Sequence, residues 1–158
     1  MPSVALIGLG SNLGDRVVNL EGAIVALSKT PGVAVLKVSS FHETEPVGGP
    51  AGQGMFLNAA AALETTLDPN SLLHVLQEIE GRFGRVRTVH WGERTLDLDL
   101  LLFDDRIIQT SEIEIPHPRI NTRRFVLEPL LEVAPGAVDP ITKRAYADIL
   151  ADLDRGLG

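Results

Sequence analysis

The order in which apolar segments follow one another constrains the fold of this chain most. A short apolar run at residues 4–9 predicts a buried strand, and residues 15–29 follow with the apolar spacing of a helix. Apolar runs at residues 33–42 and 56–65 predict two more strands, a second helix follows, and residues 96–103 predict a fourth strand. The order strand-helix-strand-strand-helix-strand is typical of a ferredoxin-like βαββαβ sandwich of the α+β class.

Both predicted helices carry local signals. The apolar face of the first helix is predicted to contain Val17, Leu20, Ile24 and Leu27. Asp68 followed by Pro69 predicts the start of the second helix, because aspartate caps helix N-termini and proline suits the first helical position. Its buried stripe is predicted to be Leu72, Leu76, Ile79 and Phe83. After residue 105 we expect an added hairpin and then two C-terminal helices, near residues 124–132 and 142–153.

Length and composition indicate a single domain over residues 1–158, since 158 residues is near the commonest domain size and no linker or repeat interrupts the chain. No apolar stretch is long enough to span a bilayer, and the first residues lack the basic start of a signal peptide. The chain has no cysteine, so disulfides and thiolate metal ligands are excluded. We expect a cytoplasmic protein without a membrane partner.

Positive charge is concentrated in one segment, although the net charge of the chain is −7. Residues 82–124 hold eight of the 14 Lys and Arg residues, and all eight are arginine. Planar guanidinium groups suit bidentate phosphate contacts, but ion pairs with the seven acids of the same segment are the simpler interpretation of composition alone. The acidic balance and the aromatic content of 4% argue against nucleic-acid binding, including by an RNA-binding ferredoxin-like module.

Three N-terminal glycines are similar to a dinucleotide-binding fingerprint without matching it. After Gly8 and Gly10, Gly14 comes one residue too late, and no acid ends the second strand to contact a ribose. The phosphate loop GxxxxGK[ST] is absent as well. We interpret these glycines as a tight strand-to-helix turn.

Two aspartates alternate with leucines in the last predicted strand, which contains Leu96-Asp97-Leu98-Asp99-Leu100. This alternation places Asp97 and Asp99 on one sheet face, about 6.5 Å apart along the strand, and the leucines in the core. Two carboxylates can converge on one or two cations, and oxygen ligands favour Mg²⁺ over zinc. An ordinary amphipathic strand has the same pattern. The nearby arginines strengthen the case for a metal–nucleotide site.

Two connections are longer than the fold requires. Residues 43–55 are rich in glycine and proline, and residues 85–95 contain three arginines and Trp91, the only tryptophan. Long connections inside a compact domain are often binding loops, and tolerated insertions are the alternative. The arginines and Trp91 favour a functional role for the second loop, which we expect to close over bound substrates.

Motifs in a fixed order extend over nearly the whole chain. They are Gly8-Leu-Gly-Ser-Asn-Leu-Gly-Asp15, Glu43-Thr-Glu-Pro-Val-Gly48, Phe56-Leu-Asn58, Arg85-Val-Arg87, Trp91-Gly-Glu-Arg94-Thr-Leu-Asp97-Leu-Asp99, Pro116-His-Pro-Arg119, Phe125-Val-Leu and Glu132-Val-Ala-Pro135. The ordered set resembles the hydroxymethyl-dihydropterin pyrophosphokinases of folate biosynthesis. Glu93 is a departure, since the family commonly has proline there. The resemblance implies transfer of pyrophosphate from ATP to the hydroxymethyl group of 6-hydroxymethyl-7,8-dihydropterin, with release of AMP.

The resemblance also implies a pterin pocket. Phe56 and Phe125 would enclose the flat ring, and Trp91 would close over it. Polar contacts to the ring edge are implied for Asn58 and for the backbone around Thr44 and Val47. Without the resemblance, both phenylalanines are more simply interpreted as core residues.

For the nucleotide, the resemblance implies that Asp97 and Asp99 bind two Mg²⁺ ions that bridge the ATP phosphates. Phosphate contacts are implied for Arg85, Arg87, Arg94, His117 and Arg123. Arg85 and Arg94, with the two aspartates, are the predicted catalytic residues. His117 alone would more simply be structural.

The partners expected on this interpretation are small molecules, ATP and a reduced pterin, and we expect a monomer. Two other functions use the same residues. A Mg²⁺-dependent phosphohydrolase or simple kinase would need the same acids and arginines, and a ferredoxin-like module that only binds its ligand would need no catalytic group.

Overall fold

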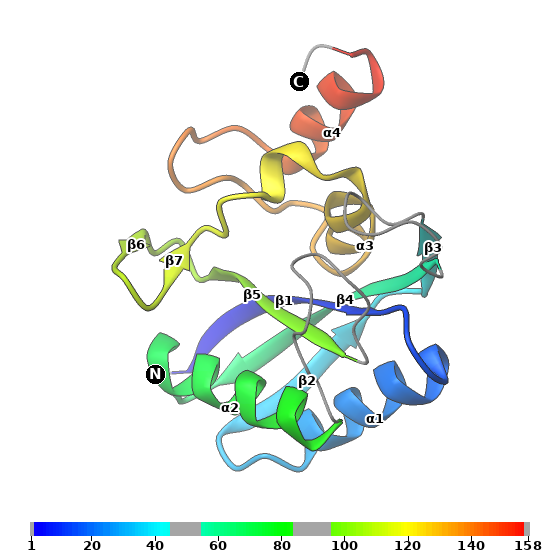
Figure 1. Cartoon of the computed structure of the whole chain (residues 1–158). Coiled ribbons are helices and arrows are strands. Elements are labelled where there is room, and N and C mark those ends of the chain that lie inside the picture. The colour runs from blue at the N-terminus through cyan, green and yellow to red at the C-terminus, as the bar shows by residue number, and fades with distance from the viewer. Residues whose placement is uncertain (1, 45–54, 84–95, 157–158) are drawn as a thin grey trace.

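The computed structural model describes residues 2–44, 55–83 and 96–156, and it contains a five-stranded antiparallel sheet with helices on both faces (Figure 1). The strands are β1 (Ser3–Ser11), β2 (Val33–Val38), β3 (His42–Thr44), β4 (Phe56–Thr65) and β5 (Asp97–Phe103). The sheet order is β2-β4-β1-β5, and β3 pairs with β4 beside β2. The predicted ferredoxin-like α+β sandwich is confirmed.

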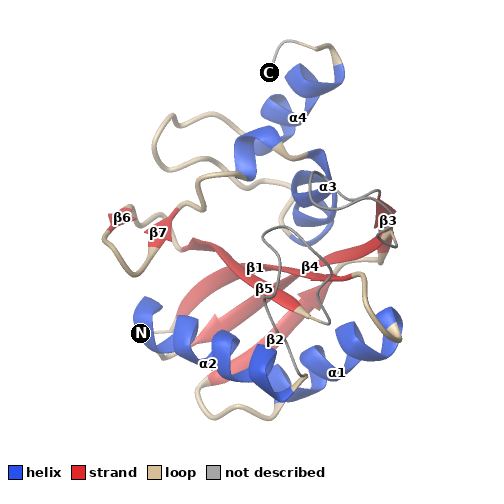
Figure 2. Cartoon of the chain, viewed as in Figure 1, coloured by secondary structure: helices blue, strands red, loops and turns tan. Residues whose placement is uncertain are grey.

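The helices form two layers, one on each side of the sheet (Figure 2). One face is covered by α1 (Arg16–Ser28) and α2 (Pro69–Arg82), and the other by α3 (Arg124–Val133), with α4 (Tyr146–Asp154) packed beyond it. Between β5 and α3 lie the predicted hairpin, β6 (Ile108–Gln109) with β7 (Glu114–Ile115), and a short 3₁₀ turn, η1 (Ile120–Thr122). No helix in the described ranges is long and apolar enough to cross a membrane.

Two separate cores result from the alternation of side chains along the strands. Ile7, Leu63 and Leu98 pack toward α1 and α2, whereas Leu101 and Leu127 belong to the core under α3 and α4. The register of β1 on β5 shifts between residues 6 and 7, and this bulge turns two consecutive leucines of β5 toward α3. On the same face of the sheet as α3, residues 10, 58 and 97 of β1, β4 and β5 are glycine, asparagine and aspartate, so this part of the face is polar.

The predicted strand over residues 33–42 is in fact two strands. The Ser39 N–H donates to the Ala60 carbonyl, as in a regular ladder. The Ala60 N–H, however, donates to the Ser39 hydroxyl oxygen at 2.8 Å instead of to the Ser39 carbonyl. This replacement interrupts the ladder, so β2 ends at Val38 and a separate β3 starts at His42. A side-chain acceptor that competes with the backbone is the physical reason for the break.

The predicted apolar face of the first helix is confirmed at Leu20, Ile24 and Leu27 and is wrong at Val17. Val17 is 46% exposed, and Asn19 is buried instead. Asn19 donates its side-chain amide to the Leu13 carbonyl at 3.0 Å and to Ser11 Oγ at 3.2 Å, which ties the helix to the preceding turn. A satisfied buried amide has thus replaced an apolar contact.

The second helix begins as predicted. Asp68 caps it by accepting a hydrogen bond from the Ser71 N–H at 2.8 Å, and Pro69 occupies the first turn. The last helix starts at Tyr146 rather than at residue 142, because Asp139 closes a turn by accepting from Ile141 N at 2.9 Å and Thr142 Oγ1 at 3.0 Å.

Candidate active site

A row of paired residues crosses four strands on the face that α3 covers in part. His42 of β3 pairs with Asn58 of β4, Asn58 pairs with Gly10 of β1, and Gly10 pairs with Asp97 of β5. Directly paired residues project their side chains to the same face. Asn58 and Asp97 therefore lie on one face, about 10 Å apart across two strand spacings, with a residue that has no side chain between them.

The glycines of β1 form the floor between these two polar groups. A Cβ at Gly10 would lie 3.2 Å from Asn58 Oδ1 and 3.8 Å from Phe56 Cδ1. Gly8 is paired in the same way with Asp99. The prediction that these two glycines form the strand-to-helix turn is wrong, since both lie within β1 and the turn has its positive φ of 73° at Gly14.

On β5 the predicted alternation is confirmed. Asp97 and Asp99 are partly exposed, while Leu98 and Leu100 are buried in the core under α1 and α2. The Nε2 atom of His117 lies 4.0 Å from Asp99 Oδ1. The structure therefore brings the two carboxylates and this imidazole to one edge of the face.

His117 is oriented by two backbone contacts. Its own N–H donates to the Leu101 carbonyl at 2.9 Å, which attaches the segment to β5, and its Nδ1 accepts from the Arg119 N–H at 3.3 Å. In a neutral ring with Nδ1 as the acceptor, the proton is on Nε2, the atom that faces Asp99. This assignment follows from the hydrogen-bond pattern.

The surroundings of His117 favour that neutral form. Burial lowers the pKa of His117, and Arg123 and Arg119 lower it further, against the opposing effect of Asp97 and Glu114. At neutral pH the imidazole is thus an uncharged donor through Nε2.

Arg123, at the junction of η1 and α3, adds a cation to this edge. Burial lowers its pKa, as does Arg119, and Asp99 and Asp97 oppose the shift, but an arginine remains charged at neutral pH. Its guanidinium carbon lies 5.4 Å from the centre of the Phe125 ring, within cation–π range. Arg123 thus stands between the carboxylate edge and an aromatic face.

Thr44, Phe56 and Asn58 form the β4 side of the face, and Phe125 lies beside Arg123 at the start of α3. Asn58 is 7% exposed, and its Nδ2 donates to Thr44 Oγ1 at 2.5 Å. Phe56, paired with Thr44, and Phe125, at the start of α3, are both partly exposed and belong to neither buried core. Because both rings are partly exposed, the two phenylalanines are not purely core residues. A flat heterocycle needs such aromatic faces together with a few directed polar groups.

Comparison with known proteins gives the family. Residues 6–135 match the family model described as 7,8-dihydro-6-hydroxymethylpterin-pyrophosphokinase. The chain belongs to this family. Its relatives include proteins named 2-amino-4-hydroxy-6-hydroxymethyldihydropteridine pyrophosphokinase. The one from Bacillus subtilis is 48% identical over 133 residues, 84% of this chain and 79% of the relative. The one from Haemophilus influenzae is 46% identical over 136 residues, 86% of this chain and 84% of the relative.

Solved structures agree at the level of the fold. The wild-type HPPK-DHPS of Plasmodium falciparum, crystallised with pteroate, superposes with a TM-score of 0.76 over 97% of this chain and 42% of that chain, at 15% identity. The triple mutant S436F/A437G/A613T of the same protein gives a TM-score of 0.75, at 14% identity, over 99% of this chain and 44% of that chain. Both support the α+β architecture of the pyrophosphokinase family.

Five of the site residues predicted from the resemblance to the pyrophosphokinases lie outside the described residues. They are Val47, Arg85, Arg87, Trp91 and Arg94. The structure brings Thr44, Phe56 and Asn58 together at one side of the face. It brings Asp97, Asp99, His117 and Arg123 together at the other side, with Phe125 next to Arg123.

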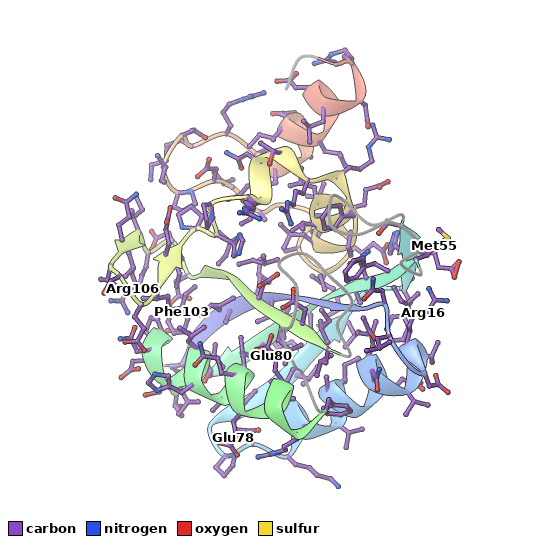
Figure 3. The ribbon with its side chains drawn as sticks, in the orientation of Figure 1. Arg16, Met55, Glu78, Glu80, Phe103 and Arg106 are labelled. Carbon is purple, nitrogen blue, oxygen red and sulfur yellow. The ribbon has the colours of Figure 1, made fainter. Side chains whose placement is uncertain are left out.

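One charged residue that supports the site was missed from the sequence. Glu80 of α2 is 7% exposed, and its Oε2 accepts from the Leu98 N–H at 2.7 Å (Figure 3). In the part of the sheet that the structure describes, β5 is an edge strand, and this carboxylate accepts from a backbone N–H between the two aspartates on the side of β5 away from β1. A glutamate four residues after Leu76, in the buried stripe of α2, was the available signal.

Arg16 was missed as well. It links the start of α1 to β3 and to the residue before β4 (Figure 3), since Nη2 contacts Glu43 Oε1 at 2.8 Å and Nη1 donates to the Met55 carbonyl at 2.9 Å. These contacts hold the end of β3 beside the beginning of β4, next to Thr44 and Phe56.

Proposed function

We propose that the α3 side of the sheet is the active site of an ATP-dependent pyrophosphokinase, with the pterin on the β4 side and the triphosphate on the β5 side. The chain is a diphosphotransferase of folate biosynthesis that transfers pyrophosphate from ATP to hydroxymethyldihydropterin. The observation that supports this division best is the row from Asn58 through Gly10 to Asp97. This row separates a buried amide from a carboxylate by about 10 Å, which supports a pterin edge at one end and a phosphate–metal group at the other.

Asp97 and Asp99 are the proposed ligands of two Mg²⁺ ions. Among the described residues, no three or more carboxylate or imidazole side chains gather into a metal site. Mg²⁺ does not require such a cluster, because it is commonly held by one or two carboxylates together with substrate phosphates and water. The pair of aspartates therefore fits this ion. Mg²⁺ held by these aspartates would supply positive charge to the phosphate oxygens.

Arg123 and His117 are proposed to bind the phosphates. Arg123 offers a charged fork beside the carboxylates, and the neutral His117 offers a hydrogen bond from Nε2. Arg85, Arg87 and Arg94 are proposed for the same role from the family motif. Arg85 and Arg94 are our candidates for offsetting the charge that develops during transfer.

The pterin is proposed to stack on Phe56 and Phe125, with its edge bound by Asn58 and Thr44. Val47 and Trp91 complete the pocket on the evidence of the motif alone. In this arrangement the hydroxymethyl oxygen attacks the β-phosphorus of ATP, the bond from that phosphorus to the oxygen leading to the α-phosphorus breaks, and AMP leaves. Such a transfer needs alignment and charge neutralisation above all, so we assign no protein general base.

Identification of the nucleotide product tests the function. The protein is incubated with ATP, Mg²⁺ and 6-hydroxymethyl-7,8-dihydropterin, and a parallel reaction omits the pterin. AMP formed only with the pterin supports the pyrophosphokinase. ADP supports a simple kinase, nucleotide breakdown without pterin supports a phosphohydrolase, and absence of turnover supports a binding module.

We also propose that residues 1–158 act as one pyrophosphokinase domain, as a cytoplasmic monomer that binds no nucleic acid. The net charge of −7 supports the last point, since polyanion binding needs a basic face. Light scattering coupled to gel filtration would show the number of chains per particle.

A further inference from the structure

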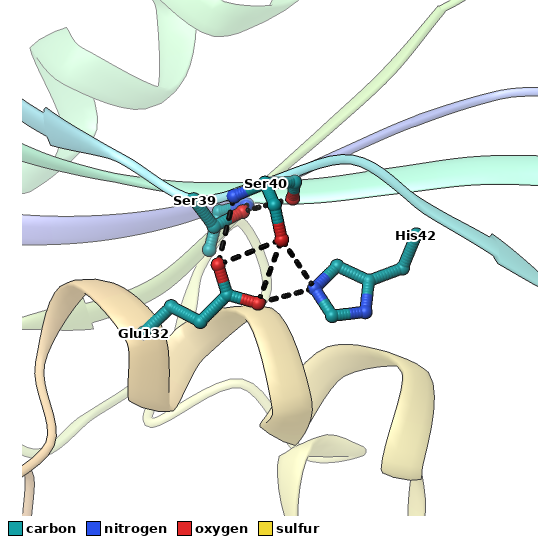
Figure 4. A network of polar contacts seen from close by, with 5 residues as sticks. Ser39, Ser40, His42 and Glu132 are labelled. Atoms are coloured by element: carbon teal, nitrogen blue, oxygen red, sulfur yellow. Dashed lines mark hydrogen bonds and ion pairs between the residues drawn. The ribbon is translucent and has the colours of Figure 1, made fainter.

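A polar network joins β3 to the C-terminal turn of α3 (Figure 4). The Glu132 carboxylate accepts from both the backbone N–H and the hydroxyl of Ser40, each at 2.8 Å. It is also paired with the ring of His42, whose Nε2 lies 3.2 Å from Ser40 Oγ. The Ser40 amide holds the pKa of Glu132 below its ordinary value, so the group is ionised at neutral pH. Hydrogen bonds to a charged acceptor are strong and directional.

Both ends of this network lead to the proposed pterin pocket. On the strand side, His42 pairs with Asn58, and Thr44, two residues further along β3, accepts from the Asn58 amide. On the helix side, Glu132 follows Phe125 by seven residues in α3, which places both on one side of the helix, about 10 Å apart. Glu132 is therefore too distant to stack with the ring and close enough to hold the elements that do.

β3 has three residues, and within the described part of the chain it pairs only with β4. Arg16 adds an ion pair to Glu43 at the other face of this strand's end, but it does not connect β3 to α3. The helix is held to β4 by apolar side chains such as Leu127 and Leu130. Apolar contacts are non-directional, so they allow the helix to shift along the sheet. Hydrogen bonds to a carboxylate are directional and oppose such a shift.

We propose that Glu132 is a positioning residue for pterin binding. Through Ser40 and His42 it sets the distance between the polar wall formed by β3 and β4 and the aromatic wall at the start of α3. This inference rests on the proposed pterin pocket. Of the described residues proposed to bind Mg²⁺–ATP, Asp97 and Asp99 lie on β5 and His117 follows β7, and only Arg123 lies at the start of α3. Loss of Glu132 should therefore affect ATP binding less than pterin binding.

The test compares the affinities of two ligands for Glu132→Ala and Glu132→Gln. In Glu132→Ala, the Kd for 6-hydroxymethyl-7,8-dihydropterin should rise by about fivefold, the order expected from losing most of one aromatic stacking contact. The Kd for a non-hydrolysable ATP analogue with Mg²⁺ should change by less than about twofold. Glu132→Gln, which keeps an acceptor for Ser40, should recover part of the pterin affinity. In the double variant with His42→Ala, the two losses should not add, because both remove the same link.

Asp152 of α4 provides a matched control. It is a surface carboxylate with two partners, Arg144 at 2.7 Å and Arg155 at 2.6 Å. Asp152→Ala should leave the pterin Kd unchanged even where the melting temperature falls. Equal weakening of both ligands in Glu132→Ala, or a lower melting temperature without any change in pterin affinity, would show that Glu132 is only a structural tie.

Phe125→Ala separates this inference from the pocket assignment. If Phe125→Ala loses pterin affinity and Glu132→Ala does not, the pocket stands and the positioning role is wrong. If Phe125→Ala binds the pterin normally, the pocket assignment is wrong, and the proposed role of Glu132 is then wrong as well.

Discussion

At the scale of single residues, Gly10 contributes by having no side chain. It is paired with Asn58 on one side and with Asp97 on the other, and a methyl group there would meet Asn58 Oδ1 at 3.2 Å. A contact this short requires the neighbour to move. From the sequence, the glycine was assigned to a turn. Its place in the site depends on a register with two strands that are distant in the chain, and local patterns carry no information about that register.

Gly10→Ala should therefore weaken pterin binding by about tenfold, because the added Cβ displaces the Asn58 amide from the ring edge. Titration of the pterin into the folded variant measures this effect. Gly136→Ala is the control, since nothing lies within 4 Å of its added Cβ. Unchanged pterin affinity in Gly10→Ala would show that the glycine floor does not shape the pocket.

The aspartates of β5 should be essential for turnover and dispensable for folding. Two like charges about 6.5 Å apart repel by about 2.5 kcal/mol at an effective dielectric constant of 20, and the nearby Arg123 offsets part of this repulsion, so removing one aspartate should change the melting temperature little. Asp97→Ala and Asp99→Ala should each abolish measurable product formation. Asp105→Ala, at an exposed position after the strand, is the control. Near-normal Mg²⁺-dependent activity in either aspartate variant would contradict the metal assignment.

The two phenylalanines should discriminate between the ligands. Phe56→Ala and Phe125→Ala should each weaken pterin binding by about 1 kcal/mol or more, with a much smaller effect on the ATP analogue. Calorimetric titration with each ligand measures both affinities. Phe41→Ala, a partly buried ring packed on the core under α1 and α2, should change neither affinity selectively. Equal losses for both ligands in the Phe56 and Phe125 variants would indicate damage to the core instead.

At the scale of elements, local signals predicted the ends that depend on local contacts. Asp68 with Pro69 marks the start of α2 correctly, because the capping contact is only three residues long. The break between β2 and β3 was not predictable, since it follows from the Ser39 hydroxyl bonding to Ala60 across the sheet. The inward position of Asn19 was missed for another reason: its amide donates to Ser11 and Leu13 just before the helix, and apolar spacing does not reveal such a contact.

In the turn before α4, the buried Asp139 carboxylate leads to a prediction about stability. Asp139 is 2% exposed. Burial alone would raise its pKa, but hydrogen bonds from Ile141, Asn121 and Thr142 outweigh that effect and leave the pKa below its ordinary value of 3.8. A carboxyl with a depressed pKa stabilises the fold fully above its unfolded pKa, and this contribution is lost as the pH falls through the folded value.

Asp139→Ala should thus lower the free energy of unfolding at pH 7 by about 2 kcal/mol, the cost of leaving buried donors unpaired. Urea denaturation at several pH values measures it. The difference in the free energy of unfolding between the wild type and the variant should become smaller as the pH is lowered from 5 to values below 3.8. A difference in unfolding free energy that does not change with pH would contradict the assignment of Asp139 as ionised.

At the scale of the whole molecule, the sequence predicted the layers well and the connections between them poorly. Apolar periodicity was sufficient for the βαββαβ order and for the inward leucines of β5, because these depend on burial alone. The position of Glu80 in the buried stripe of α2 was a signal for its burial, but the hydrogen-bond partners of Glu80 and Glu132 could not be predicted. Their partners lie 18 and 92 residues away, and only the folded sheet brings them together. Five predicted site residues fall outside the described residues, so their placement stays a prediction.

The central claim is that the β- and γ-phosphates move together from ATP to the pterin on this face of the sheet. Transfer from ATP radiolabelled at the β-phosphorus tests it most directly, because AMP alone could also arise from hydrolysis. With Mg²⁺ and 6-hydroxymethyl-7,8-dihydropterin, the label should appear in the pterin product in amounts equal to the AMP released, and Asp99→Ala should abolish this transfer. Label that remains in ADP, or that appears as free pyrophosphate while the pterin stays unmodified, would contradict the account.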